Sequence, residues 1–122
     1  MFGPYSTGSP YWEFKYDVRC IEQSGQRYTF RIYYYLYRSN GSSYYKGAVW
    51  TFYAWVNGTY QQMDFTSGYV SVPEQTDHLV TYMDMVVTMD YSLNSRVISV
   101  SAGFNSNNNV SPYRSSGGTN TI

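Results

Sequence analysis

The chain has 122 residues, of which 43% are hydrophobic and only 13% are charged, and 16 Tyr help to raise the aromatic share to 20%. This length predicts a single domain with one core, and the apolar content excludes a disordered chain. Eight basic and eight acidic residues give a formal net charge of zero, which removes the electrostatic attraction that nucleic-acid binding depends on.

The first predicted strand runs from Tyr11 to Glu22, after a lead-in over residues 1–10 that is rich in Gly, Pro and Ser. Its apolar side chains occur at every second position, which is the pattern of a half-buried strand. These inward residues are Trp12, Phe14, Tyr16, Val18 and Cys20. On this pattern Cys20 is a small buried hydrophobe rather than a reactive thiolate.

The second predicted strand follows the polar break at residues 23–26 and forms an antiparallel hairpin with the first. One of its faces is expected to enter the core, and the other carries tyrosines. The inward face has Tyr28, Phe30, Ile32, Tyr34 and Leu36, and the outward face has Arg27, Thr29, Arg31, Tyr33, Tyr35 and Tyr37.

The third predicted strand spans Tyr44 to Val56 and ends at Asn57-Gly58. An Asn-Gly pair between two alternating segments favours a two-residue turn with positive φ at both residues, so residues 59–65 are expected to return as its partner. Its inward residues are Ala48, Trp50, Phe52, Ala54 and Val56. A short strand then covers residues 69–72 and ends at Pro73.

The run from His78 to Tyr91 again alternates with period two, with Leu79, Met83 and Met85 on one face and His78 and Tyr82 on the other. Its β-branched residues favour a strand over a helix. The segment Ser92-Leu93-Asn94-Ser95 is expected to close a hairpin to a strand over residues 97–104. Residues 105–122 are rich in Asn, Ser and Gly and are expected to be either flexible or held by a neighbouring subunit.

Short strands separated by turn residues predict an all-β fold, an antiparallel β-sandwich of about seven strands that is immunoglobulin-like or jelly-roll-like. The expected organisation is a flexible lead-in (residues 1–10), the β-sandwich domain (residues 11–104) and a polar tail (residues 105–122). A single Cys cannot form an internal disulfide, so stability is expected to come from packing.

The order of these features resembles the small immunoglobulin-like modules of siphovirus tail proteins, over about residues 12–104. The resemblance rests on an aromatic first strand, a Tyr-rich second strand, the strand ending in Val56-Asn57-Gly58, and the segment Arg96–Phe104 after a polar hairpin. The His-Asn-x-Asp-Gly turn of such modules is replaced here by residues 89–95. The resemblance implies a non-enzymatic virion component.

Catalytic and metal-binding signatures are weak in this sequence. His78 is the one histidine, and a nucleophile–base pair would need it beside Cys20 or a serine, oriented by Asp77 or Asp84. One His and one Cys cannot form a tetrahedral zinc site without several carboxylates, and no calcium-loop motif occurs. The eight acids leave a glycosidase pair as a minor alternative. We therefore expect no enzymatic activity and no cofactor.

The outward aromatic residues are the most informative feature. Tyr33, Tyr35 and Tyr37 are spaced by two, and Tyr53 and Trp55 occupy the corresponding side of the third predicted strand. If the two strands share a sheet, five rings form one surface, and such rings give large, rigid contact area. The surface is predicted either to contact other virion subunits or a second copy, or to bind cell-surface glycans; simple cover by the tail or loops is the third alternative.

Residues 1–10 contain no basic region followed by an apolar stretch, and no apolar run is long enough to span a membrane. A surface rich in Tyr, Ser, Asn and Gly is typical of proteins that function outside cells. We therefore expect a protein made in a host cytoplasm, assembled into a virion and released with it, with no nucleic-acid or membrane partner.

Overall fold

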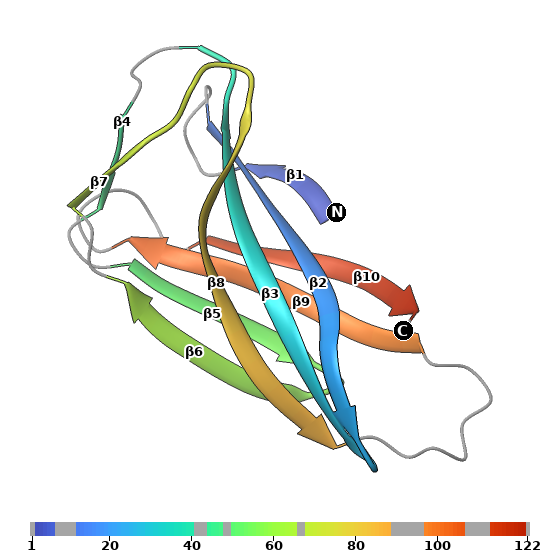
Figure 1. Ribbon diagram of the computed structural model, residues 1–122. Helices are drawn as coiled ribbons and strands as arrows, with labels where there is room; N and C mark the ends of the chain where they lie inside the picture. The colour runs from blue at the N-terminus through green and yellow to red at the C-terminus, as the bar shows by residue number, and fades with distance from the viewer. Residues whose placement is uncertain are drawn as a thin grey trace.

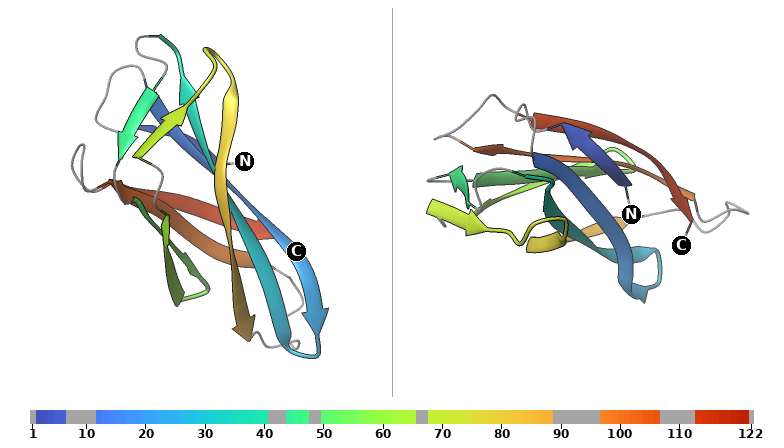
Figure 2. Two further views of the ribbon diagram at one scale, coloured as in Figure 1. Left: turned by 60° about the vertical axis from the view of Figure 1, so that its left-hand side comes forward. Right: turned by 90° about the horizontal axis from the view of Figure 1, so that it is seen from above.

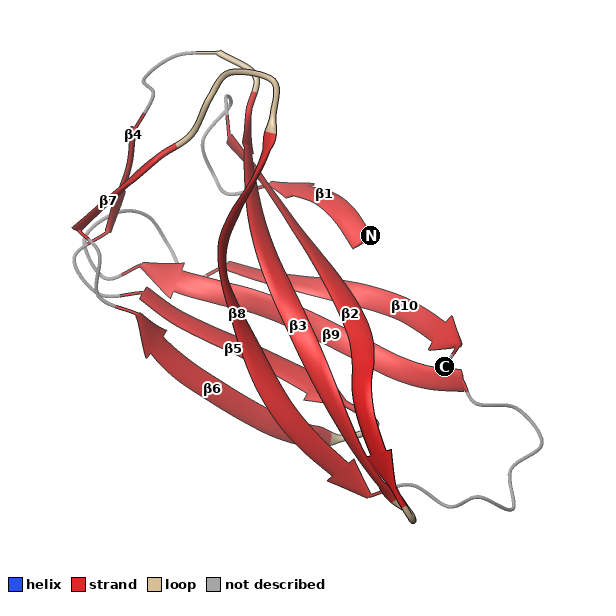
Figure 3. Ribbon diagram, in the orientation of Figure 1, coloured by secondary structure: helices blue, strands red, loops and turns tan. Residues whose placement is uncertain are grey.

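The computed structural model describes residues 2–6, 12–40, 44–47, 50–65, 68–88, 97–106 and 113–121, and all regular structure among them is β-strand (Figure 3). None of these residues belongs to a helix of the length and apolar character that a membrane span needs. The strands are β1 Phe2–Ser6, β2 Trp12–Ser24, β3 Arg27–Arg38, β4 Tyr44–Gly47, β5 Trp50–Val56, β6 Thr59–Phe65, β7 Gly68–Ser71, β8 Asp77–Thr88, β9 Val97–Ser106 and β10 Tyr113–Thr121.

The strands form two four-stranded antiparallel sheets and one small two-stranded sheet (Figure 1). The first sheet has the order β1-β2-β3-β8, the second has the order β10-β9-β5-β6, and β4 pairs with β7. The all-β antiparallel class expected from the alternating pattern is confirmed.

The inner faces of the two larger sheets contribute to one hydrophobic core, and Figure 2 shows the two layers from two further directions. Alternation puts every second residue of each strand into this core, as expected for strands with one covered face. The buried side chains of the first sheet include Trp12, Phe14, Tyr16, Val18, Tyr28, Phe30, Ile32, Tyr34, Leu36, Met83, Met85 and Val87. Those of the second include Phe52, Ala54, Val56, Val100 and Ala102.

Two predicted hairpins are confirmed. Strands β2 and β3 pair from Trp12 opposite Arg38 to Ser24 opposite Arg27. At the β5–β6 turn, Asn57 has φ 47° and Gly58 has φ 82°, so both turn residues have the positive φ that a two-residue hairpin turn of this type requires.

The predicted hairpin between residues 78–91 and 97–104 is wrong. Strand β8 pairs with β3, whereas β9 pairs with β5 and β10 in the other sheet. The segment 92–95, which was to form the turn, lies outside the described residues. Local alternation identifies strands but carries no information on which sheet each strand joins.

The predicted strand over residues 44–56 is divided into β4 and β5, which belong to different sheets. Residues 48 and 49, and with them the inward position of Ala48, lie outside the described part of the chain. Phe52, Ala54 and Val56 are buried as expected, while the side chain of Trp50 is not described.

The structure also describes strands within the lead-in and within the polar tail. Strand β1 lies within residues 1–10 and pairs with β2, and β10 lies within residues 105–122 and pairs with β9. Backbone hydrogen bonds along a neighbouring strand can pair a polar segment that has few apolar residues of its own.

Cys20 is exposed, so its predicted burial is wrong. The register of β2 against β3 shifts between Cys20 and Glu22, and every β2 residue from Arg19 onward is exposed. The apolar residues still alternate with period two up to Cys20 in the sequence, but the end of β2 is exposed. The Cys20 thiol instead donates a hydrogen bond to the backbone carbonyl of Glu22, at 3.4 Å.

Candidate binding faces

The outer face of the β2–β3–β8 sheet brings tyrosines from two strands together. Tyr33 on β3 lies opposite Tyr82 on β8, with their ring centroids 6.1 Å apart. Tyr33, Tyr35 and Tyr37 are half-buried, whereas their even-numbered neighbours on β3 are fully buried. Tyr82 is 47% exposed. This sheet therefore presents aromatic rings outward, as the spacing of the three β3 tyrosines predicts.

Leu79 joins this face because the register of β8 shifts. Tyr34 lies opposite Thr81, but Tyr35 lies opposite Leu79, so Val80 is the extra residue of a bulge. A one-residue slip turns the following side chains to the other face. Leu79, which shares the alternation of the buried Met83 and Met85, is consequently 44% exposed. We call Tyr33, Tyr35, Tyr37, Leu79 and Tyr82 the tyrosine face.

Ion pairs border the tyrosine face. The Lys15 ammonium lies 2.8 Å from the Asp77 carboxylate and 4.7 Å from the ring centroid of Tyr37. The Arg19 guanidinium lies 5.8 Å from the ring centroid of Tyr33. Cations over aromatic faces are attracted by the ring quadrupole, so these contacts hold the tyrosine rings in place.

Arg31 and Asp84 form the best-defined of these pairs. The Arg31 Nε and Nη2 atoms donate to the two Asp84 carboxylate oxygens at 2.7 and 3.0 Å, and the guanidinium lies 4.3 Å from the Tyr82 ring centroid. This hydrogen bonding lowers the pKa of Asp84 and raises the pKa of Arg31. Partial burial, followed by the charge of Asp17, raises the pKa of Tyr35.

Tyr53 and Trp55 do not lie on the tyrosine face, because β5 belongs to the other four-stranded sheet. The five predicted rings would form one surface only if β3 and β5 shared a sheet, and they do not. Tyr53 is buried, with its ring edge-on to Trp55 at 5.6 Å between centroids. Trp55 lies opposite Tyr60 of β6, 4.8 Å away between ring centroids. The predicted site residues thus separate into two aromatic groups on different sheets.

Sequence reasoning missed Tyr82, Leu79 and Tyr60. Tyr82 was not predicted, because nothing local shows that β8 lies beside β3. The Asn57-Gly58 turn did carry the information for Tyr60, because a two-residue turn sets Trp55 opposite Tyr60.

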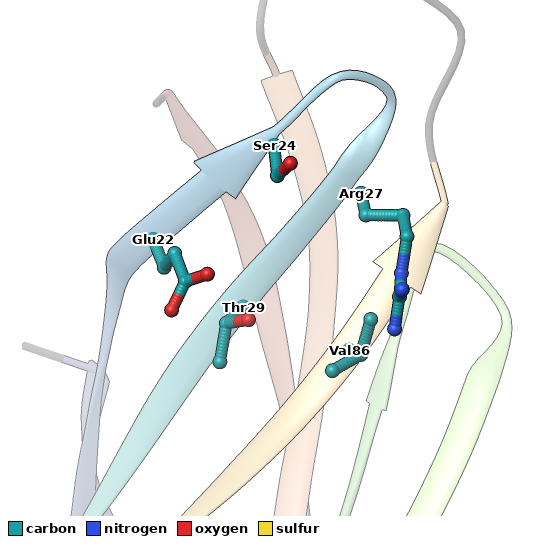
Figure 4. A pocket seen from close by; sticks show the side chains of 5 residues that line it. All are labelled: Glu22, Ser24, Arg27, Thr29 and Val86. Carbon is teal, nitrogen blue, oxygen red and sulfur yellow. The ribbon is translucent and has the colours of Figure 1, made fainter.

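A shallow polar pocket of about 180 Å³ lies near the β2–β3 turn. Its lining residues, shown in Figure 4, are Glu22, Ser24, Arg27, Thr29 and Val86. Glu22 is the single carboxylate among them. A glycoside hydrolase needs two carboxyl groups flanking the scissile bond, so this lining does not provide that chemistry.

The structure does not bring His78 and Cys20 together. His78 lies opposite Leu36, whereas Cys20 lies opposite Phe30. These positions are six residues apart along β3, or about 20 Å at the usual rise of a strand. Within the described ranges, no three His, Cys, Asp or Glu residues are grouped so that they could hold a metal ion.

No family model, curated protein or solved structure matches this chain.

Proposed function

We propose that this chain is a non-enzymatic structural or decoration protein of a phage particle, and that it docks on a neighbouring subunit through the tyrosine face. The observation that carries the proposal is the row of tyrosines on the outer face of β3, which Tyr82 and Leu79 of β8 extend. Exposed aromatic and aliphatic side chains on one sheet face are typical of protein interfaces.

The charges around the tyrosine face support a protein partner. Lys15 and Arg31 are each paired with a carboxylate of β8, Asp77 and Asp84. Because its charges are already paired, this face attracts phosphate groups only weakly. It can still pack on a flat protein surface that itself has few unpaired charges. The tyrosines lose little side-chain entropy when they are covered.

The fold forms part of the same proposal. Two antiparallel four-stranded sheets over one core are consistent with an immunoglobulin-like or jelly-roll-like β-sandwich. The chain resembles the siphovirus tail modules named above in the order of its sequence features over about residues 12–104. A protein that is made in the host cytoplasm and released with the particle also fits its composition.

Two measurements test the proposal: light scattering after size-exclusion chromatography, and mass spectrometry of purified particles. We expect the chain in the particles, and we expect a Tyr35→Ser, Tyr82→Ser variant to be lost from them or to lose self-association. Ile21→Ser is the matched control, because Ile21 is also exposed (45%) but lies at the β2 bulge, outside the tyrosine face. A chain that is absent from particles and monomeric at high concentration would exclude this function.

A further inference from the structure

A second exposed group of side chains lies on the β5–β6 hairpin, on the outer face of the other sheet. Trp55, Tyr53 and Thr51 of β5 lie opposite Tyr60, Gln62 and Asp64 of β6. Tyr60 is 43% exposed, and Gln62 and Asp64 are also exposed, whereas Trp55 is half-buried. We call Trp55, Tyr60, Gln62 and Asp64 the hairpin site.

The hairpin site combines aromatic rings with neutral hydrogen-bonding groups. The Trp55 and Tyr60 rings lie 4.8 Å apart between centroids and are tilted by 58°. The Tyr60 hydroxyl donates a hydrogen bond to Gln62 Oε1 at 2.7 Å, which leaves the Gln62 amide hydrogens as donors. The Asp64 carboxylate accepts a hydrogen bond from the Thr51 hydroxyl at 2.9 Å and keeps further acceptor capacity.

These groups are arranged along β6 at regular intervals. Residues two apart on one face of a strand are separated by about 7 Å, so Tyr60, Gln62 and Asp64 form a row about 14 Å long. An aromatic ring at one end is followed by an amide and then by a carboxylate. Such a row suits an extended ligand that has an apolar face at one unit and hydroxyl groups along its length.

The hairpin is held rigidly. The Asn57-Gly58 turn fixes the register of Trp55 against Tyr60. On the inner side of β6, Gln61 Nε2 donates to the backbone carbonyl of Asp84 at 2.7 Å and so joins the hairpin to the edge of the other sheet. A site that is ordered before binding loses less entropy when the ligand arrives.

We propose that the hairpin site binds a neutral oligosaccharide, with one sugar ring packed against the Trp55–Tyr60 ring pair and the following hydroxyls hydrogen-bonded to Gln62 and Asp64. Aromatic rings pack on the C–H faces of sugars, the Gln62 amide hydrogens can donate to sugar hydroxyl oxygens, and the Asp64 carboxylate can accept from sugar hydroxyls. Asp64 is the one charged residue of the site and would repel phosphate or sulfate groups. Nucleic acids and acidic glycans are therefore disfavoured.

The test is titration of the isotope-labelled protein with cellotetraose, maltotetraose and chitotetraose, followed by NMR. We expect at least one of them to shift the Trp55 indole and Gln62 amide signals, which a Trp55→Phe variant and a Gln62→Ala variant identify. Unchanged signals at about 10 mM of all three sugars would overturn the proposal, because this concentration fills most of a site even when its Kd is about 1 mM.

Variants then assign the contacts. We expect Trp55→Ala and Gln62→Ala each to weaken binding by about tenfold or more, which is the effect of about 1.4 kcal/mol, while Ile21→Ser binds as the unmodified chain does. Because Trp55 also packs on Tyr53, a folding defect in Trp55→Ala is separated from a binding defect by Gln62→Ala, whose side chain is exposed. Sugar binding that both variants retain would refute the hairpin site. This site lies on a different sheet from the tyrosine face, so its failure would leave the docking proposal standing.

Discussion

The hydroxyl of Tyr34 on β3 donates a hydrogen bond to the backbone carbonyl of Tyr53 on β5, at 3.0 Å, and so joins the two four-stranded sheets inside the core. The Tyr34 ring also lies 4.7 Å from that of Phe52. Burial raises the pKa of Tyr34, so its hydroxyl keeps the proton that it donates.

Removing this hydroxyl should destabilise the fold measurably. In Tyr34→Phe the Tyr53 carbonyl loses a partner in a buried position, which costs about 1–3 kcal/mol of unfolding free energy. Urea denaturation followed by circular dichroism measures the change. Tyr82→Phe removes an exposed hydroxyl and should stay within about 0.5 kcal/mol of the unmodified chain. Equal stability of the two variants would contradict a role of this hydrogen bond in joining the sheets.

The β5–β6 turn should be sensitive to a side chain at Gly58. This residue has φ 82°, a conformation that L-residues with a Cβ atom adopt at a cost. Gly58→Ala should therefore lower the unfolding free energy by about 1 kcal/mol, although a Cβ there meets no other atom within 4 Å. Asn57→Gly serves as the control, because glycine readily adopts the positive φ that the turn requires at this position. A stability of Gly58→Ala equal to that of the control would argue against strain at this position.

The Arg31–Asp84 pair should make stability depend on pH in the acidic range. Hydrogen bonding to Arg31 lowers the pKa of Asp84 below its ordinary value of 3.8. The folded state therefore holds this carboxylate ionised at a pH where the unfolded chain has bound a proton. The stabilisation is complete above the ordinary pKa and disappears as the pH falls through the lower folded-state value.

Urea midpoints measured from about pH 6 down to about pH 2 test this dependence. Asp84→Asn removes the titrating group, so its midpoint should fall less steeply below about pH 4. The two side chains are partly exposed, so we expect a small difference that salt reduces. Parallel curves for the two proteins would show that the pair contributes nothing to acid sensitivity.

The exposure of Cys20 predicts its reactivity. Because the thiol lies on the uncovered end of β2, a disulfide reagent such as 5,5′-dithiobis(2-nitrobenzoate) should modify one thiol per chain in the folded protein. The rate should be within about tenfold of the rate in denaturant, since no unfolding step is needed for access. Met83→Leu, a buried substitution of similar volume, is a control for folding. Protection that is lost only in denaturant would place Cys20 in the core, as its alternation predicts.

The sequence by itself determined where several strands and one turn lie. Period-two alternation located β2, β3 and β8 to within a few residues, because a half-covered strand must place every second side chain inward, and the Asn57-Gly58 turn located β6. The Asn57-Gly58 pair determined the β5–β6 register, because few residue pairs accept positive φ twice. The same alternation predicts that Tyr33, Tyr35 and Tyr37 lie on the outer face of β3.

Only the tertiary structure decided which strands became neighbours. Strand pairing depends on contacts between distant segments, and alternation is the same whichever sheet a strand joins. Alternation could not decide whether Trp55 and Tyr35 share a sheet, and the structure puts Trp55 on the other sheet and Tyr82 beside Tyr33. The exposure of Cys20 and Leu79 has a similar origin, since the end of a sheet and a bulge change burial without changing the local pattern.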